Sequence, residues 1–139
     1  MIIEKLQPEY IPQVLALQQQ IVPYALDPEY AAANYETLLH REECCILAAR
    51  DGNTVLGTVS GFCCRGLAST LLVIEDLIVC EGLRGSGIGT KLMTSIHAYG
   101  KSQGCEYAIL VSSGFRKQAH KFYEKLGYTE DVRGFRMEL

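Results

Sequence analysis

The chain has 139 residues, of which 48% are hydrophobic and 21% are charged, and its formal net charge at pH 7 is −3. This length suits one domain with its own core, so residues 1–139 are expected to form a single domain. A weakly acidic chain without a lysine- or arginine-rich run argues against a nucleic-acid partner, and no apolar run approaches the roughly 20 residues needed to cross a bilayer.

The first half of the chain is predicted to form a strand, two helices and a β-hairpin. Asp27 is followed by a proline and an acid, which is the pattern of a helix N-cap and first turn. Turn residues at 51–53 separate two strand-like stretches. The expected elements are strand 2–6, a helix within 8–22, helix 28–40, and hairpin strands 44–50 and 54–64.

The second half is predicted to alternate strands and helices. Residues 70–79 are too apolar for a strand with one solvated face, which favours a central strand covered on both faces. The expected elements are strand 70–79, helix 87–101, strand 105–111, helix 115–126 and strand 132–138. This order predicts a mixed sheet with helices on both faces.

The six cysteines are interpreted as free thiols. The N-terminus has no signal-peptide pattern, so the cytoplasm is the expected compartment, and its reducing conditions disfavour disulfides. Two pairs, at 44–45 and 63–64, are adjacent in strand-like stretches, where neighbouring side chains point to opposite faces. Such pairs cannot share a metal ion, so no metal site is expected.

A glycine-rich turn lies between strand 70–79 and the helix that follows it. Residues 83–90 read Leu-Arg-Gly-Ser-Gly-Ile-Gly-Thr. Glycines at a helix N-terminus let backbone N–H groups approach an anion, and the helix dipole adds partial positive charge there. Phosphate is the expected guest; the alternative is a helix-start turn that binds nothing.

Two common phosphate-binding loops do not fit this spacing. A P-loop needs Gly-Lys followed by Ser or Thr, whereas Lys91 here follows Thr90. The dinucleotide fingerprint needs Gly-x-Gly-x-x-Gly, whereas Gly85, Gly87 and Gly89 are evenly spaced by two. The loop therefore belongs to neither class.

The pattern Arg84-x-x-Gly87-x-Gly89, between a central strand and a helix, resembles the acetyl-CoA signature of the GNAT superfamily of N-acetyltransferases. Residues 122–128, Phe-Tyr-Glu-Lys-Leu-Gly-Tyr, resemble that family's C-terminal motif, and the resemblance covers about residues 54–139. It implies an α/β (α+β mixed) GNAT fold: a central mixed, mostly antiparallel sheet of six to seven strands flanked by about four helices. It also implies acetyl-CoA as co-substrate, with no metal required.

The resemblance further implies where the coenzyme binds. Its pyrophosphate is expected on the N–H groups of the glycine turn, and its pantetheine arm along the main chain of strand 70–79. Serine stands at 112, where the family often has asparagine, and can still donate a hydrogen bond. The implied cofactor-binding residues are Leu77, Ile78, Val79, Arg84, Gly85, Ser86, Gly87, Ile88, Gly89, Thr90, Ser112 and Lys117.

Two residues are the candidates for catalysis. Tyr123 falls at the family's tyrosine position, where its hydroxyl would protonate the coenzyme's sulfur; the alternative is a tyrosine that only packs. Glu75 aligns with the acid that serves as base in several relatives, and burial would raise its pKa. A structural ion pair is the alternative for Glu75. Asp76 should point to the opposite face of the strand and is interpreted as structural.

The acceptor half is the part about which the sequence says least. The expected reaction is direct acetyl transfer, in a ternary complex, to a small primary amine that resembles an amino acid or a polyamine. Peptide or protein acetylation and a non-catalytic acyl-CoA-binding module are the alternatives, and a homodimer is possible by family habit. The candidate substrate residues are Tyr24, Asp27, Tyr30, Arg65 and His120.

Overall fold

The computed structural model describes residues 1–114 and 116–139 and contains one five-stranded sheet in the order β1-β2-β3-β4-β5. Neighbouring strands are antiparallel except β4 and β5, which are parallel. The predicted mixed, mostly antiparallel sheet is therefore confirmed. The strands are β1 (Ile2–Lys5), β2 (Cys44–Asp51), β3 (Thr54–Arg65), β4 (Thr70–Val79) and β5 (Tyr107–Leu110).

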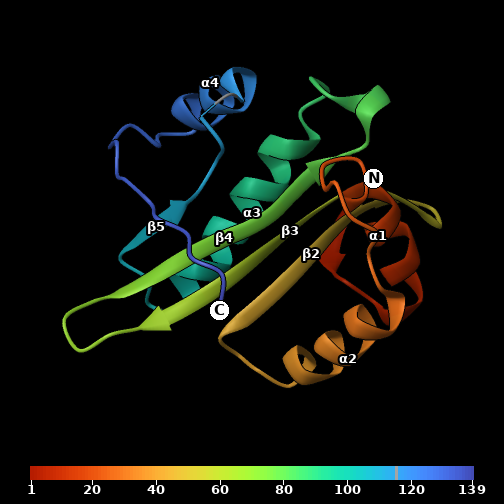
Figure 1. Cartoon of the computed structure of the whole chain (residues 1–139), viewed down its shortest axis with the longest axis horizontal. Coiled ribbons are helices and arrows are strands. Elements are labelled where there is room, and N and C mark those ends of the chain that lie inside the picture. Colours follow the sequence, from red (N-terminus) through yellow and green to blue (C-terminus); the bar gives the residue numbers. More distant parts are fainter. Residues whose placement is uncertain (115) are drawn as a thin grey trace.

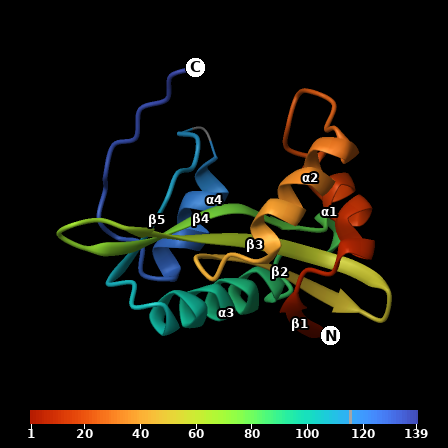
Figure 2. The same cartoon turned by 90° about the horizontal axis from the view of Figure 1, so that it is seen from below.

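Within residues 1–114 and 116–139, four α-helices flank the sheet, as predicted. The helices are α1 (Ile11–Gln18), α2 (Pro28–Leu39), α3 (Ile88–Ser102) and α4 (Lys117–Lys125), with short 3-10 turns η1 (Pro8–Tyr10) and η2 (Glu81–Leu83). Figure 2 shows α1 and α2 on one face of the sheet and α3 on the other. Asp27 caps α2 by accepting a hydrogen bond of 2.9 Å from the Glu29 N–H. None of the helices in the described part combines the length and apolar character that crossing a bilayer requires.

The end of the chain differs from the prediction. Residues 132–138, expected to form a last strand, form none, and the expected count of six to seven strands is therefore too high for the described residues. The segment runs as an extended trace after α4 (Figure 1), and Phe135 is 90% exposed. A strand pattern without a partner strand or a covered face lacks the contacts that stabilise it. The helix expected at 115–126 begins at Lys117, and Phe115 lies outside the described residues.

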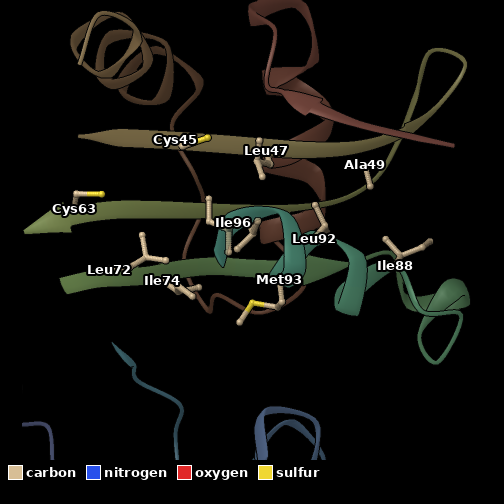
Figure 3. Close-up of a cluster of buried hydrophobic side chains, with 11 residues drawn as sticks. Cys45, Leu47, Ala49, Cys63, Leu72, Ile74, Ile88, Leu92, Met93 and Ile96 are labelled. Atoms are coloured by element: carbon tan, nitrogen blue, oxygen red, sulfur yellow. The ribbon is translucent and has the colours of Figure 1, made fainter. Parts of the chain in front are cut away.

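The main core lies between α3 and the sheet. Three side chains of α3, Leu92, Met93 and Ile96, are fully buried. Figure 3 shows this cluster between α3 and strands β2, β3 and β4. A second cluster joins the other face of the sheet to α1 and α2; its buried members are Leu6, Val14, Leu17, Tyr35, Ala48, Val55 and Ile78.

Replacing Leu92 with alanine is expected to lower the free energy of unfolding by about 2–5 kcal/mol, because it leaves a cavity in the middle of the larger cluster. Urea denaturation followed by circular dichroism measures this loss. Leu67→Ala is the matched control, since Leu67 is fully exposed and its truncation should change stability by no more than about 0.5 kcal/mol. Equal effects of the two variants would contradict this placement of the core.

Candidate functional site

A β-bulge interrupts β4 near its end. Thr58 of β3 pairs with Ile78, and Ser60 pairs with Glu75, so the single residue Val59 lies opposite both Asp76 and Leu77. Asp76 has a φ of 55°, in the left-handed region that few residues other than glycine, asparagine and aspartate adopt. Asp76 is therefore the extra residue of the bulge.

The bulge changes which face of the sheet the following side chains occupy. Before it, Leu72 and Ile74 pack in the α3 cluster, and after it Leu77 and Val79 pack against that cluster. Ile78 packs in the cluster of α1 and α2. A strand that alternated regularly would place Ile74 and Ile78 on the same face. Glu75 consequently lies on the face of α1 and α2, at the point where the strand is bent.

The two carboxyl groups at the bulge are harder to ionise than ordinary ones. Both side chains keep contact with solvent. Even so, the surrounding protein raises the pKa of Glu75, first by desolvation and then through the negative charge of Asp76, and desolvation also raises the pKa of Asp76. A carboxylate with a raised pKa is a stronger base, so the expected direction for Glu75 is found.

Asp76→Asn is expected to raise the melting temperature at neutral pH. The raised pKa of Asp76 means that its contribution to stability is fully present below its unfolded-state pKa and is lost as pH rises through its folded-state pKa. Asparagine stays neutral and tolerates a positive φ. The gain over the wild type should therefore shrink as the solution is acidified, which thermal melts at several pH values measure. Asp76→Ala, also neutral but strained at this φ, should melt below Asp76→Asn at every pH; a pH-independent gain would contradict this reasoning.

Strands β4 and β5 pair over only half the length of β4. Their register runs from Leu71 opposite Tyr107 to Ile74 opposite Leu110, and β4 then continues to Val79 without β5 beside it. On its other side this end of β4 still pairs with β3. The main chain of Leu77–Val79 therefore has one edge free in the described sheet, where an extended ligand can pair.

The glycine turn leads from η2 directly into α3. Gly85 and Gly87 have positive φ values of 83° and 88°, and Gly87 is the N-cap of α3. The N–H of Ser86 is bonded to the Leu83 carbonyl, and that of Arg84 to the Glu81 carbonyl. The N–H groups of Ile88–Thr90 begin the helix and have no carbonyl partner within it. These helix-start donors, with Gly85 and Gly87, are the ones free to bind an anion.

Helix α4 packs against the start of α3. A Cβ atom on Gly89 would lie 3.2 Å from Cζ of Phe122 and 3.6 Å from a methyl group of Val79. A side chain at this position would press on the ring of Phe122, which would have to move by a few tenths of an ångström. Gly89 thus brings together the anion-binding turn, the free end of β4 and the helix that carries Tyr123.

Tyr123 is half-buried and flanked by two aromatic rings. Its ring centroid lies 5.3 Å from that of Phe122 and 6.1 Å from that of Tyr128, both in edge-on arrangements. Burial raises the pKa of Tyr123, although the positive charge of Arg116 acts in the opposite direction. The hydroxyl is therefore protonated at neutral pH and can donate a proton or a hydrogen bond.

The loop after β5 contains a buried hydroxyl that has no partner. The Ser112 Oγ is shielded from solvent and makes no hydrogen bond within the described residues. His120 Nε2 lies 2.9 Å from the Ser113 carbonyl and so closes this loop onto α4, whose first residue, Lys117, is exposed. A buried hydroxyl without a partner is costly unless a ligand supplies one.

The structure does not gather all of the predicted substrate residues. Tyr24 and Tyr30 are 64% and 68% exposed and lie on either side of Asp27, which serves as the cap of α2. Arg65 donates a hydrogen bond to the Gln103 carbonyl and pairs with Thr70 at the start of β4. It therefore lies at the opposite end of β4 from the free edge at Leu77–Val79. His120 is on α4, near Tyr123. The acceptor candidates thus fall into three separate places.

The expected coenzyme fits this group of residues. Unpartnered N–H groups at the start of α3 suit a pyrophosphate, and the free edge of Leu77–Val79 suits an amide-bearing arm. Among the residues that the structure describes, the Ser112 hydroxyl also lacks a hydrogen-bond partner. By contrast, a surface hollow of about 610 Å³ lies between α3 and the first two strands. It contains none of the predicted site residues.

Three features of the structure were not predicted. The bulge at Asp76 had one available signal, an aspartate inside an apolar strand, because aspartate tolerates left-handed backbone. A 2.6 Å hydrogen bond between His97 and Tyr128 joins positions 31 residues apart, for which the sequence gives no signal. The Cys63 and Cys105 thiols lie 3.3 Å apart.

All six cysteines are free, and no cluster of metal-ligating side chains occurs in residues 1–114 and 116–139.

Comparisons with known proteins show the family and the fold. The family model described as "Acetyltransferase (GNAT) family" matches residues 8–128. A glucosamine 6-phosphate N-acetyltransferase of Trypanosoma brucei brucei is 38% identical over 66 residues, which cover 48% of this chain and only 43% of that protein.

Two solved structures illustrate the likeness in fold. A transcriptional regulator from Bacillus halodurans superimposes with a TM-score of 0.91 at 20% identity, over 99% of both chains. The aminoglycoside N-acetyltransferase AAC(6')-Iy, in complex with the bisubstrate analogue CoA-S-monomethyl-acetylneamine, gives a TM-score of 0.82 at 18% identity, over 99% of this chain and 98% of that one. At such identities the likeness shows the fold alone.

Proposed function

The chain belongs to the acetyltransferase (GNAT) family, and on this basis we propose that it transfers an acetyl group from acetyl-CoA to a primary amine of a small molecule. The observation that carries the proposal is the meeting of three features at Gly89: the anion-binding turn, the unpaired end of β4 and the helix with Tyr123. A binding module needs the first two features only. The half-buried, protonated tyrosine favours catalysis.

Acetyl-CoA, when bound, supplies an acyl group activated as a thioester. The N–H groups of the turn, within Arg84–Thr90, would hold its pyrophosphate, and the exposed Lys117 would add positive charge. The main chain of Leu77–Val79 would hold the pantetheine arm as an added strand, and Ser112 Oγ would donate a hydrogen bond to it. These contacts orient the thioester without a metal ion.

Two side chains are assigned to proton movement. Tyr123 holds a proton on its hydroxyl at neutral pH and would donate it toward the leaving sulfur. Glu75 lies on the face of α1 and α2, and its raised pKa suits a base that takes a proton from the incoming ammonium group, directly or through water. With an acid and a base on separate elements, direct transfer in a ternary complex needs no covalent enzyme intermediate.

A small amine is the proposed acceptor, and the relatives point to the same class. One is named for glucosamine 6-phosphate, and another was solved with an analogue that joins coenzyme A to an aminoglycoside. Tyr24, Asp27 and Tyr30 could contact such an amine from the α1–α2 connection, and His120 from α4. Peptide acetylation is the second candidate. The cytoplasm is the proposed compartment, because the cysteines are all free.

We also propose a homodimer that uses the end of the chain. In the described residues the sheet ends at β5, and the segment after α4 exposes Phe135 and Met137, at 90% and 79%. An extended segment with exposed apolar side chains and an open strand edge favour pairing between two copies. Sedimentation velocity of the wild type and of Phe135→Arg tests this, since only the wild type should dimerise.

The proposed function is tested by a ligand panel followed by turnover assays. Acetyl-CoA should raise the melting temperature more than ATP or NAD does. Thiol release is then measured with amino acids, polyamines, glucosamine 6-phosphate, neamine and a short peptide. Turnover with a small amine supports the proposal. Tight coenzyme binding without turnover of any amine would favour a binding module, and turnover of the peptide alone would favour the second candidate.

A further inference from the structure

Helix α4 is joined to the rest of the domain by few contacts. It contains no fully buried residue, in contrast to α3, which contributes Leu92, Met93 and Ile96 to the core. The orientation of Tyr123 therefore depends on a small number of half-buried side chains around the end of α4. Because Tyr123 is the proposed acid, whatever fixes this end of the helix bears on the reaction.

At the end of α4, Tyr128 contacts Tyr123 through a backbone hydrogen bond and through an edge-on contact of their rings. The Tyr128 N–H donates to the Tyr123 carbonyl at 3.1 Å, and the Gly127 N–H donates to the Glu124 carbonyl at 3.0 Å. These two hydrogen bonds, together with the φ of 104° at Gly127, form a Schellman motif at the end of the helix. Such motifs commonly include a side-chain contact between the positions that Tyr123 and Tyr128 occupy. Their rings meet edge-on, with centroids 6.1 Å apart.

Tyr128 is in turn hydrogen-bonded to α3, the helix that packs in the main core. Its hydroxyl lies 2.6 Å from Nε2 of His97, and the two rings lie 5.7 Å apart. His97 follows directly after Ile96, which is fully buried. A single side-chain hydrogen bond thus connects the well-packed helix that begins at the glycine turn to the helix that carries Tyr123.

Both partners of this hydrogen bond are uncharged at neutral pH. Burial, helped by the positive charge of Lys101, lowers the pKa of His97, so the imidazole is neutral at neutral pH. Burial and then the neighbouring Tyr123 raise the pKa of Tyr128 to about 12, so its hydroxyl keeps its proton. The contact fits a bond in which the Tyr128 hydroxyl donates to Nε2 of His97, in the tautomer that carries the ring proton on Nδ1.

We propose that His97 and Tyr128 are positioning residues that hold the Tyr123 hydroxyl in the orientation for proton donation, through the 2.6 Å bond between α3 and α4. The inference rests on the proposed function, in which Tyr123 is the acid. Neither residue needs to touch a substrate. Their removal should reduce turnover while leaving coenzyme binding at the glycine turn nearly unchanged.

Tyr128→Phe removes the hydroxyl and keeps the ring. It is expected to lower kcat roughly 10-fold, less than the ~100-fold that a 1 Å misplacement can cause, and to change KM for acetyl-CoA by no more than about 2-fold. His97→Leu should match it. His97→Gln should retain most of the activity, because an amide oxygen can accept the same hydrogen bond near the place of Nε2.

Tyr99→Phe is the matched control. Tyr99 lies on the same helix, and its hydroxyl donates a bond of equal length, 2.6 Å, to the Glu42 carbonyl, away from α4. This variant should keep kcat within about 2-fold of the wild type even where its melting temperature falls. All rates are compared well below the melting temperatures, so that a loss of fold is not mistaken for a loss of positioning.

The decisive comparison is a double-mutant cycle. If Tyr128 acts through Tyr123, then Tyr128→Phe should not lower kcat further in a Tyr123→Phe background. An equal loss in both backgrounds, or no loss in either, overturns the proposal. If Tyr123→Phe alone leaves kcat unchanged, the role of Tyr123 falls and the positioning role falls with it.

A readout independent of turnover separates this proposal from the proposed function. Nitrogen-15 NMR of the histidines should show Nε2 of His97 unprotonated and hydrogen-bonded, with a shift that changes in Tyr128→Phe and not in Tyr99→Phe. This result is expected even if no amine in the panel is acetylated. No response to Tyr128→Phe overturns the proposed bond whatever the activity, and protonation on Nε2 overturns the assignment of Tyr128 as its donor.

Discussion

Tyr123→Phe should lower kcat for amine acetylation by about 100-fold, the lower end of the range for loss of a general acid. Phenylalanine keeps the edge-on contacts with Phe122 and Tyr128 and removes only the proton donor. Coenzyme binding depends on the glycine turn and the end of β4, so the Kd for acetyl-CoA should not change. The loss should therefore appear in kcat and not in affinity.

Stopped-flow thiol release and calorimetric titration of acetyl-CoA measure these two quantities. Burial raises the pKa of Tyr123, so the wild-type rate should hold to a higher pH than an ordinary tyrosine acid allows, and this alkaline limb should vanish in Tyr123→Phe. Tyr107→Phe is the control, because Tyr107 is half exposed and pairs at the far end of β4. A Tyr123→Phe enzyme with wild-type kcat would remove the tyrosine from the mechanism.

Glu75→Gln should reduce kcat/KM for the amine by about 100-fold near neutral pH, because glutamine cannot accept the proton of the ammonium group. The raised pKa of Glu75 has a defined consequence for the wild type. The active form is ionised, so activity should fall as pH drops through a value above that of an ordinary glutamate. That acidic limb should be missing from the variant.

The choice of amine sharpens this test. An acceptor that is already unprotonated at the assay pH needs no base, so the loss in Glu75→Gln should be smallest with weakly basic amines. Glu130→Gln, at an exposed position after α4, should behave as the wild type does with every amine. If Glu75→Gln keeps both the rate and the acidic limb, the carboxylate has a structural role at the bulge.

Most of the fold could be predicted because its signals are local. The apolar run at 70–79 gives the bounds of β4 correctly, and Asp27 with the proline after it gives the start of α2. The segment at 132–138 has a strand pattern too, but pattern alone cannot supply a partner. Whether a segment pairs depends on tertiary contacts that a single sequence does not show.

Only the parts of the candidate site that lie within the two sequence motifs could be predicted from the sequence. The glycine turn lies at the start of α3, as predicted, and the structure adds that Phe122 packs against it. The roles of Tyr123 and Glu75 stay predictions. Regular alternation was assumed for Glu75 and Asp76, and the bulge breaks it. A bulge arises from the register between two strands, so the sequence of one strand does not reveal it.

The extra residue of the bulge also changes which residues of β4 face α3. Ahead of Asp76 even-numbered residues face α3, and beyond it odd-numbered residues do. A substitution in this strand changes one contact, but inserting a single residue directly after Asp76 would turn Leu77 and Val79 away from α3 and direct Ile78 toward it. Single-residue insertions after the bulge should therefore be far less tolerated than apolar exchanges, whereas deletion of Asp76 removes the bulge and leaves Leu77 and Val79 on the side of α3.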